Sequence, residues 1–143
     1  MKRYLLCILL LLFGCQSSEK KFLTGCDLLR EQAQFPVWSY RSFNELSQLF
    51  STEEQSEIHK GCYITSSLLD ATRILLIESE NPQRFIQSLS NIDINHKETY
   101  HWLKSEENSF VDHSDIIIRS NHILWVVSRN HEKVVSLFNQ LFP

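Results

Sequence analysis

Two segments of this chain share one order of apolar and polar residues, and this match limits the possible folds more than any other feature. Residues 74–92 (ILLIESENPQRFIQSLSNI) align without a gap with residues 123–141 (ILWVVSRNHEKVVSLFNQL). Each segment starts with an apolar run of strand length and continues with apolar residues at helical spacing. With a strand before each segment, the pattern predicts two ββα units. We therefore expect an α+β fold, with one antiparallel sheet and both helices on one face.

The match has two possible explanations, which are an internal duplication and the pattern that any two strand–turn–helix units share. Two repeats are too few for a solenoid, so the ββα layout follows from either explanation. The strands are expected at 63–68 and 72–79, and at 115–119 and 122–128. The helices are expected from Asn81-Pro82 onward, at 97–104 and at 131–141.

Two S-x-x-E motifs precede the first ββα unit. Ser42 with Glu45 and Ser51 with Glu54 each have the form of a capping box, so they predict two short helices. The chain before them contains a polar tether and a stretch broken by Pro36, which predicts an irregular lead-in over 15–41. We therefore expect a small α+β domain at 42–143.

The first fifteen residues, MKRYLLCILLLLFGC, have the features of a lipoprotein export signal. Lys2 and Arg3 form a charged start, an apolar run follows, and Gly14 precedes Cys15. The run is shorter than the roughly 20 apolar residues of a membrane-spanning helix, and it ends in a small residue, as a processed signal does. Residues 1–14 are therefore expected to be a signal peptide, and Cys15 the lipidated residue.

Other interpretations of this start stay open. A secretory signal cut at a small residue fits the same residues, and so does an uncleaved anchor. A second match, LTGC, ends at Cys26. The polar residues 16–21 separate it from the apolar run, whereas the processing peptidase needs its cysteine at the membrane surface. We therefore assign lipidation to Cys15.

Lipidation defines the expected location and partner. The protein would face the extracytoplasmic side of the cell membrane or outer membrane, with the membrane itself as partner through the lipid anchor. Thiols can oxidise there. Once Cys7 leaves with the signal and Cys15 carries lipid, Cys26 and Cys62 remain as a possible disulfide. Two unrelated thiols are the alternative.

The charge of the chain argues against nucleic acid as a partner. The formal net charge is −3, and the loss of Lys2 and Arg3 makes the mature chain more acidic. Affinity for phosphate backbones comes mainly from Lys and Arg, so no nucleic-acid binding is expected. Three glycines, three prolines and 43% apolar residues indicate a folded domain rather than a disordered chain.

His96, His101 and His113 are weak candidates for metal ligands. The gap between His96 and His101 fits the spacing of paired zinc ligands, and Glu98 and Asp112 lie near them in the sequence. The sequence contains neither H-E-x-x-H nor C-x-x-C, so solvent-exposed loop histidines are the favoured interpretation. We assign no catalytic residue, metal or cofactor from the sequence.

Trp125 falls on a strand that is expected to be central. It should share a face of the sheet with Ile123 and Val127, and pack against Phe85 and Phe138 of the two helices. Burial in the core is therefore expected for Trp125.

Several segments together resemble a known family. They are the lipidated cysteine, the strand ATRILLIES, a stretch with Tyr100 and Trp102, and the closing DIIIRSNHILWVVSRNHEKVVSLFNQLF. Over residues 55–142 the chain resembles short bacterial lipoproteins of Gram-positive type that carry a domain of unknown function (domain-of-unknown-function family 4358). The resemblance supplies no catalytic residues to carry over.

Two classes of function are compatible with these observations. The first is a lipid-anchored binding or scaffolding module of the cell envelope, whose partner is an envelope protein or a small ligand. The alternative is a small envelope hydrolase that acts on cell-wall or peptide substrates, with or without a metal. Convergence of His96, His101 and His113 in a concave pocket would favour the hydrolase, and an apolar groove or an open sheet edge would favour the binding module.

Overall fold

A five-stranded antiparallel sheet forms the middle layer of the fold, in the order β1-β2-β3-β5-β4. The computed structural model describes residues 18–35, 40–41, 43–66, 70–102 and 110–143. The strands are β1 (Tyr40–Arg41), β2 (Lys60–Thr65), β3 (Arg73–Glu78), β4 (Ser114–Arg119) and β5 (His122–Val127). The helices are α2 (Ser18–Ala33), α3 (Phe43–Gln48), α4 (Thr52–Ser56), the 3₁₀ helix η1 (Pro82–Phe85), α5 (Ile86–Trp102) and α6 (His131–Leu141). The expected α+β class is confirmed.

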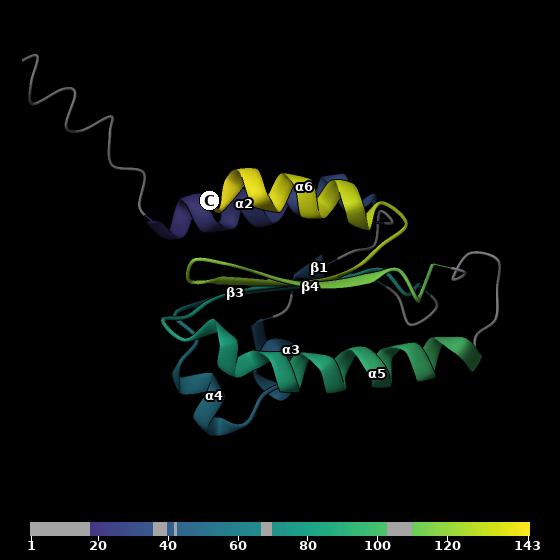
Figure 1. Ribbon diagram of the computed structural model, residues 1–143, viewed down its shortest axis with the longest axis horizontal. Helices are drawn as coiled ribbons and strands as arrows, with labels where there is room; N and C mark the ends of the chain where they lie inside the picture. The colour runs from purple at the N-terminus through teal and green to yellow at the C-terminus, as the bar shows by residue number, and fades with distance from the viewer. Residues whose placement is uncertain (1–17, 36–39, 42, 67–69, 103–109) are drawn as a thin grey trace, which may run out of the picture.

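Helices cover both faces of this sheet. Figure 1 shows α2 and α6 on one side and α3, α4 and α5 on the other. On the first side Leu76 and Leu124 pack with Phe138, in what we call the α2/α6 core. On the second side Leu75 packs with Phe85, in the α5 core. The expectation that the helices lie on one face is therefore wrong.

The register of β3 and β5 explains why α5 and α6 cover opposite faces of the sheet. Leu75 pairs with Trp125, and Leu76 pairs with Leu124. In the alignment of the two segments, Leu124 corresponds to Leu75. In the sheet, however, Leu124 stands opposite Leu76, one residue further along. Directly opposite residues point to the same face, and a shift by one residue reverses the face. The second ββα unit is therefore turned over relative to the first, and its helix covers the other face.

The segment before Ser42 contains a long helix in place of the expected irregular lead-in. α2 buries Phe22, Cys26, Leu29 and Ala33, which recur every three or four residues and belong to the α2/α6 core. The expected domain start at residue 42 is therefore wrong, because α2 is part of the same hydrophobic core. Ser42 itself lies outside the described residues.

The remaining expected elements agree with the structure only in part. The hairpin of β4 and β5 turns at Ser120 and Asn121, and α6 has the expected bounds, so both are confirmed. β2 begins at Lys60, earlier than expected. α5 continues without a break, so a separate helix at 97–104 is wrong. Asn81 precedes η1 but provides no side-chain cap.

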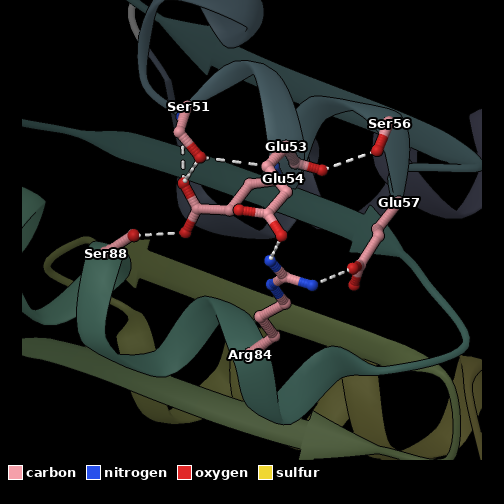
Figure 2. A network of polar contacts seen from close by, with 7 residues as sticks. All are labelled: Ser51, Glu53, Glu54, Ser56, Glu57, Arg84 and Ser88. Carbon is pink, nitrogen blue, oxygen red and sulfur yellow. Dashed lines mark hydrogen bonds and ion pairs between the residues drawn. The ribbon is translucent and has the colours of Figure 1, made fainter.

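α4 begins with the capping box that the sequence predicts. Ser51 Oγ accepts a hydrogen bond from the backbone N–H of Glu54 at 3.3 Å, and Glu54 Oε2 accepts one from the backbone N–H of Ser51 at 2.9 Å. Figure 2 shows that Arg84 of η1 reaches this helix and forms ion pairs with Glu53 and Glu57. The network holds α4 against the start of α5.

Trp125 lies in the α5 core with Ile123, as expected, and its side chain is 1% exposed. Phe85 belongs to the same core. Phe138 lies in the α2/α6 core on the opposite face, so the expected contact between Trp125 and Phe138 is wrong. Trp125 Nε1 donates a hydrogen bond to Asp93 Oδ1 of α5 at 2.9 Å, so the ring is held by a polar contact as well as by packing.

A disulfide joins Cys26 of α2 to Cys62 of β2. Both residues are buried in the α2/α6 core. The bond spans a sequence separation of 36 residues and ties the first described helix to the sheet. Of the two possibilities that the sequence leaves open for these cysteines, the structure contains the bonded pair.

Reduction of this disulfide should lower the free energy of unfolding by about 3–4 kcal/mol, because the cross-link restricts the unfolded chain. Urea unfolding with and without reductant measures the change. The double variant Cys26→Ser/Cys62→Ser is the control, and its stability should not respond to reductant. Two titratable thiols at these positions in protein purified without reductant would contradict the assignment.

Candidate functional site

Three charged or polar residues form a row across the sheet at one end of the α2/α6 core. Lys60 of β2 pairs in register with Glu78 of β3, and Glu78 pairs with His122 of β5. Lys60 Nζ lies 2.8 and 2.9 Å from the two carboxylate oxygens of Glu78. His122 Nε2 lies 3.2 Å from Glu78 Oε2. The carboxylate therefore bridges a lysine and a histidine.

The environment shifts the pKa values of this row. Burial alone would raise the pKa of Glu78, but the hydrogen bonds and charge of Lys60, with a further contribution from His122, hold it below its ordinary value. Burial lowers the pKa of His122, and the neighbouring Glu78 only partly opposes this effect. At neutral pH the row thus contains an ionised carboxylate and a neutral imidazole.

A pocket of about 630 Å³ opens beside this row, between residues 18–28 of α2 and the end of α6. Its walls are mainly apolar and include Phe22, Leu28 and Phe142, while Glu78 and His122 supply polar groups. Such a combination of apolar walls and a few polar groups is typical of sites for small ligands.

Gly25 shapes this pocket. A Cβ atom at this position would lie 2.7 Å from Cζ of Phe142, which is closer than real contacts allow. The glycine therefore lets the Phe142 ring lie directly on α2. Phe142 also lies beside the His122 ring, with a centroid distance of 4.5 Å, so the aromatic wall meets the polar row.

Lys60 also extends to the first turn of α2, where its ammonium group donates a hydrogen bond to Ser18 Oγ. The hydroxyl of Ser18 therefore pairs with an ammonium group that is already bound to Glu78. A serine nucleophile needs a base that can take its proton. In this contact the ammonium group of Lys60 is the donor and Ser18 Oγ the acceptor, so the contact does not draw the proton away from the serine.

The site residues that the sequence predicts do not come together in one site. Cys15 lies outside the described residues. His101 is exposed and lies 3.3 Å from Asp112, and the His113 ring packs against His131 at a centroid distance of 5.3 Å. Among the described residues, no group of three or more His, Cys, Asp or Glu side chains comes together as a metal site requires.

His96 lies inside the α5 layer and not on a solvent-exposed loop. Its ring packs on Tyr100 with a centroid distance of 4.6 Å and against the edge of Trp125 at 5.5 Å. Burial, followed by the positive charge of Arg73, lowers the pKa of His96 to about 4. The favoured interpretation of His96 as a solvent-exposed residue is therefore wrong.

No family model, curated protein or solved structure matches this chain. The resemblance to short bacterial lipoproteins therefore stays a prediction that depends on the residues quoted for it. Within the described ranges, no helix combines the length and apolar character that a membrane span requires.

His96 should make the stability of the fold depend on pH. Its pKa is about 4 in the folded chain and about 6.5 in an unfolded chain, so only the unfolded state gains a proton between these values. The contribution of His96 is therefore complete above about pH 6.5 and is lost as the pH falls toward 4. The expected loss is about 3 kcal/mol.

Unfolding by urea at pH 7 and pH 4.5 checks this prediction. The variant His96→Phe keeps an aromatic ring but cannot titrate, so its stability should fall less than that of the parent chain over the same interval. Equal losses in the two proteins would show that other groups cause the pH dependence.

Proposed function

We propose that this chain is a lipid-anchored, extracytoplasmic binding module of the cell envelope. In this proposal Cys15 carries the lipid, and the pocket between α2 and α6 takes a small amphiphilic ligand. The observation that carries the proposal is the apolar pocket at the start of α2, together with the row of Lys60, Glu78 and His122 beside it.

The position of the pocket supports a role near the membrane. Ser18 lines the pocket, and it follows Cys15 by three residues. Three residues span at most about 10 Å. A lipid on Cys15 would therefore hold the mouth of the pocket close to the bilayer surface.

The disulfide supports an extracytoplasmic location. Cys26 and Cys62 are joined within the core. Disulfides persist in oxidising compartments and are rare in the cytosol of mesophiles. A pair that ties α2 to the sheet is therefore consistent with export through the predicted signal at residues 1–14.

The lining of the pocket supports an amphiphile as ligand. Phe22, Leu28, Leu141 and Phe142 offer apolar walls to a hydrocarbon chain or ring. Lys21 also lines the pocket, and its ammonium group can meet a polar head group. An apolar body with one polar end satisfies both parts of this surface, as long-chain fatty acids do.

Lipidation can be tested at Cys15 itself. Cys15→Ser should leave an unprocessed precursor that incorporates no radiolabelled palmitate, because the acyl group needs the thiol. The parent chain should incorporate label and fractionate with membranes. Label that persists in the variant and disappears when Cys26 is also replaced would move the lipid to Cys26 and contradict the proposal.

Ligand binding can be tested with residues 16–143, which contain every described element, once a cooperative thermal transition shows that they fold. Leu28 lines the pocket and is 39% exposed. Leu28→Glu should weaken binding of a fluorescent fatty acid at least tenfold, because it places a charge in the apolar wall.

A matched control is present on the same helix. Leu23 is 38% exposed but is not among the residues that line the pocket. Leu23→Glu should leave the affinity for the fluorescent fatty acid unchanged. Equal effects of the two substitutions, or no saturable binding by the parent chain, would contradict the amphiphile site.

A further inference from the structure

We propose that two copies of this chain associate through β4, in an antiparallel register centred on Ile117. β4 is the last strand in the sheet order and pairs with β5 on one side. Among the described residues, no strand covers its other side. The proposal depends on this edge alone and not on the proposed ligand site.

The hydrogen-bonding pattern shows which groups of β4 are available. The carbonyl of His113 accepts a hydrogen bond from the N–H of Ser128, at the start of the β4–β5 ladder. In an antiparallel pair, such bonds recur at every second residue. Asp115, Ile117 and Arg119 therefore direct their backbone groups toward β5, and Ile116 and Ile118 direct theirs toward the open edge.

An antiparallel pair of β4 strands satisfies these outward groups. When Ile117 faces the partner's Ile117 on the two-fold axis, Ile116 stands opposite the partner's Ile118. Both residues have outward backbone groups, so each can exchange two hydrogen bonds with its opposite residue. The register is therefore compatible with the backbone of this strand.

The charges of Asp115 and Arg119 favour this register over the adjacent antiparallel registers. With Ile117 on the axis, Asp115 stands opposite the partner's Arg119, and Arg119 stands opposite the partner's Asp115. Opposite charges that face each other across two strands stabilise the pair, and like charges destabilise it. A register centred on Ile116 places Asp115 opposite an isoleucine, and one centred on Ile118 places it opposite an asparagine. In both registers the ionic match is lost.

Both charged residues lie on the α6 side of the sheet, where their present contacts leave them available. Arg119 Nε donates to Asn139 Oδ1 at 2.7 Å, and an arginine carries further N–H donors. The Asp115 carboxylate lies 3.7 Å from His131 Nε2 and its side chain is 38% exposed. Neither contact occupies all the bonding capacity of its side chain.

The position of α6 is compatible with a second copy at this edge. Figure 1 shows α6 and α5 on opposite sides of the sheet, and α6 contacts both β4 and β5. Neighbouring strands lie about 4.8 Å apart. A helix above two outer strands would then lie about 10 Å from its copy, which matches the distance between packed helices.

Charge exchange on the full-length chain tests the proposal by sedimentation analysis in detergent. The parent chain should form a dimer. Asp115→Arg should weaken dimerisation roughly tenfold, because it creates two like-charged pairs. The double variant Asp115→Arg/Arg119→Asp should restore it. A monomeric parent chain, or a double variant no better than the single one, would overturn the proposal.

Cysteine cross-linking tests the register independently. Ile117→Cys should form a disulfide-linked dimer on oxidation, beyond any band seen for the parent chain, because its Cα atom would lie about 4.5 Å from that of its copy. Asp115→Cys is the matched control on the same strand and face, and it should not cross-link. Equal cross-linking at both positions would contradict a register centred on Ile117.

Discussion

The pairing of β3 with β5 is the constraint on which the rest of the structure depends. Leu75, Leu76 and their partners in β5 are almost fully buried, on both faces of the sheet. A strand pair that is apolar on both sides needs a helical layer on each side. α5 covers one face, and α2 together with α6 covers the other. α2 therefore completes the cover of one face of the sheet.

The elements that follow a regular pattern could be predicted from the sequence. β4 and β5 are apolar runs on either side of the turn at Ser120-Asn121, and α6 shows helical spacing. Ser51 with Glu54 forms the predicted capping box. α2 was missed because Gly25 lies in its middle and Pro36 follows it, and both residue types are unfavourable in a helix interior. The regular spacing of Phe22, Cys26 and Leu29 was the available signal.

The faces of the two helices could not be read from the alignment of the two segments. That alignment compares residues along the chain, whereas the face depends on which residues stand opposite each other across the sheet. The polar row was missed for the same reason. Lys60, Glu78 and His122 are far apart in sequence and meet only through two strand registers. The pocket also needed α2, which forms one of its walls.

The contact between α2 and α6 has a consequence for the order in which the fold can be completed. Phe22 and Cys26 share one core with Phe138 and Phe142, so the earliest described helix depends on the latest. In the proposed export from the N-terminus, α2 crosses the membrane first and α6 last. Until α6 arrives, the apolar face of α2 has only part of its cover, and the disulfide to Cys62 can hold α2 against the sheet during that interval.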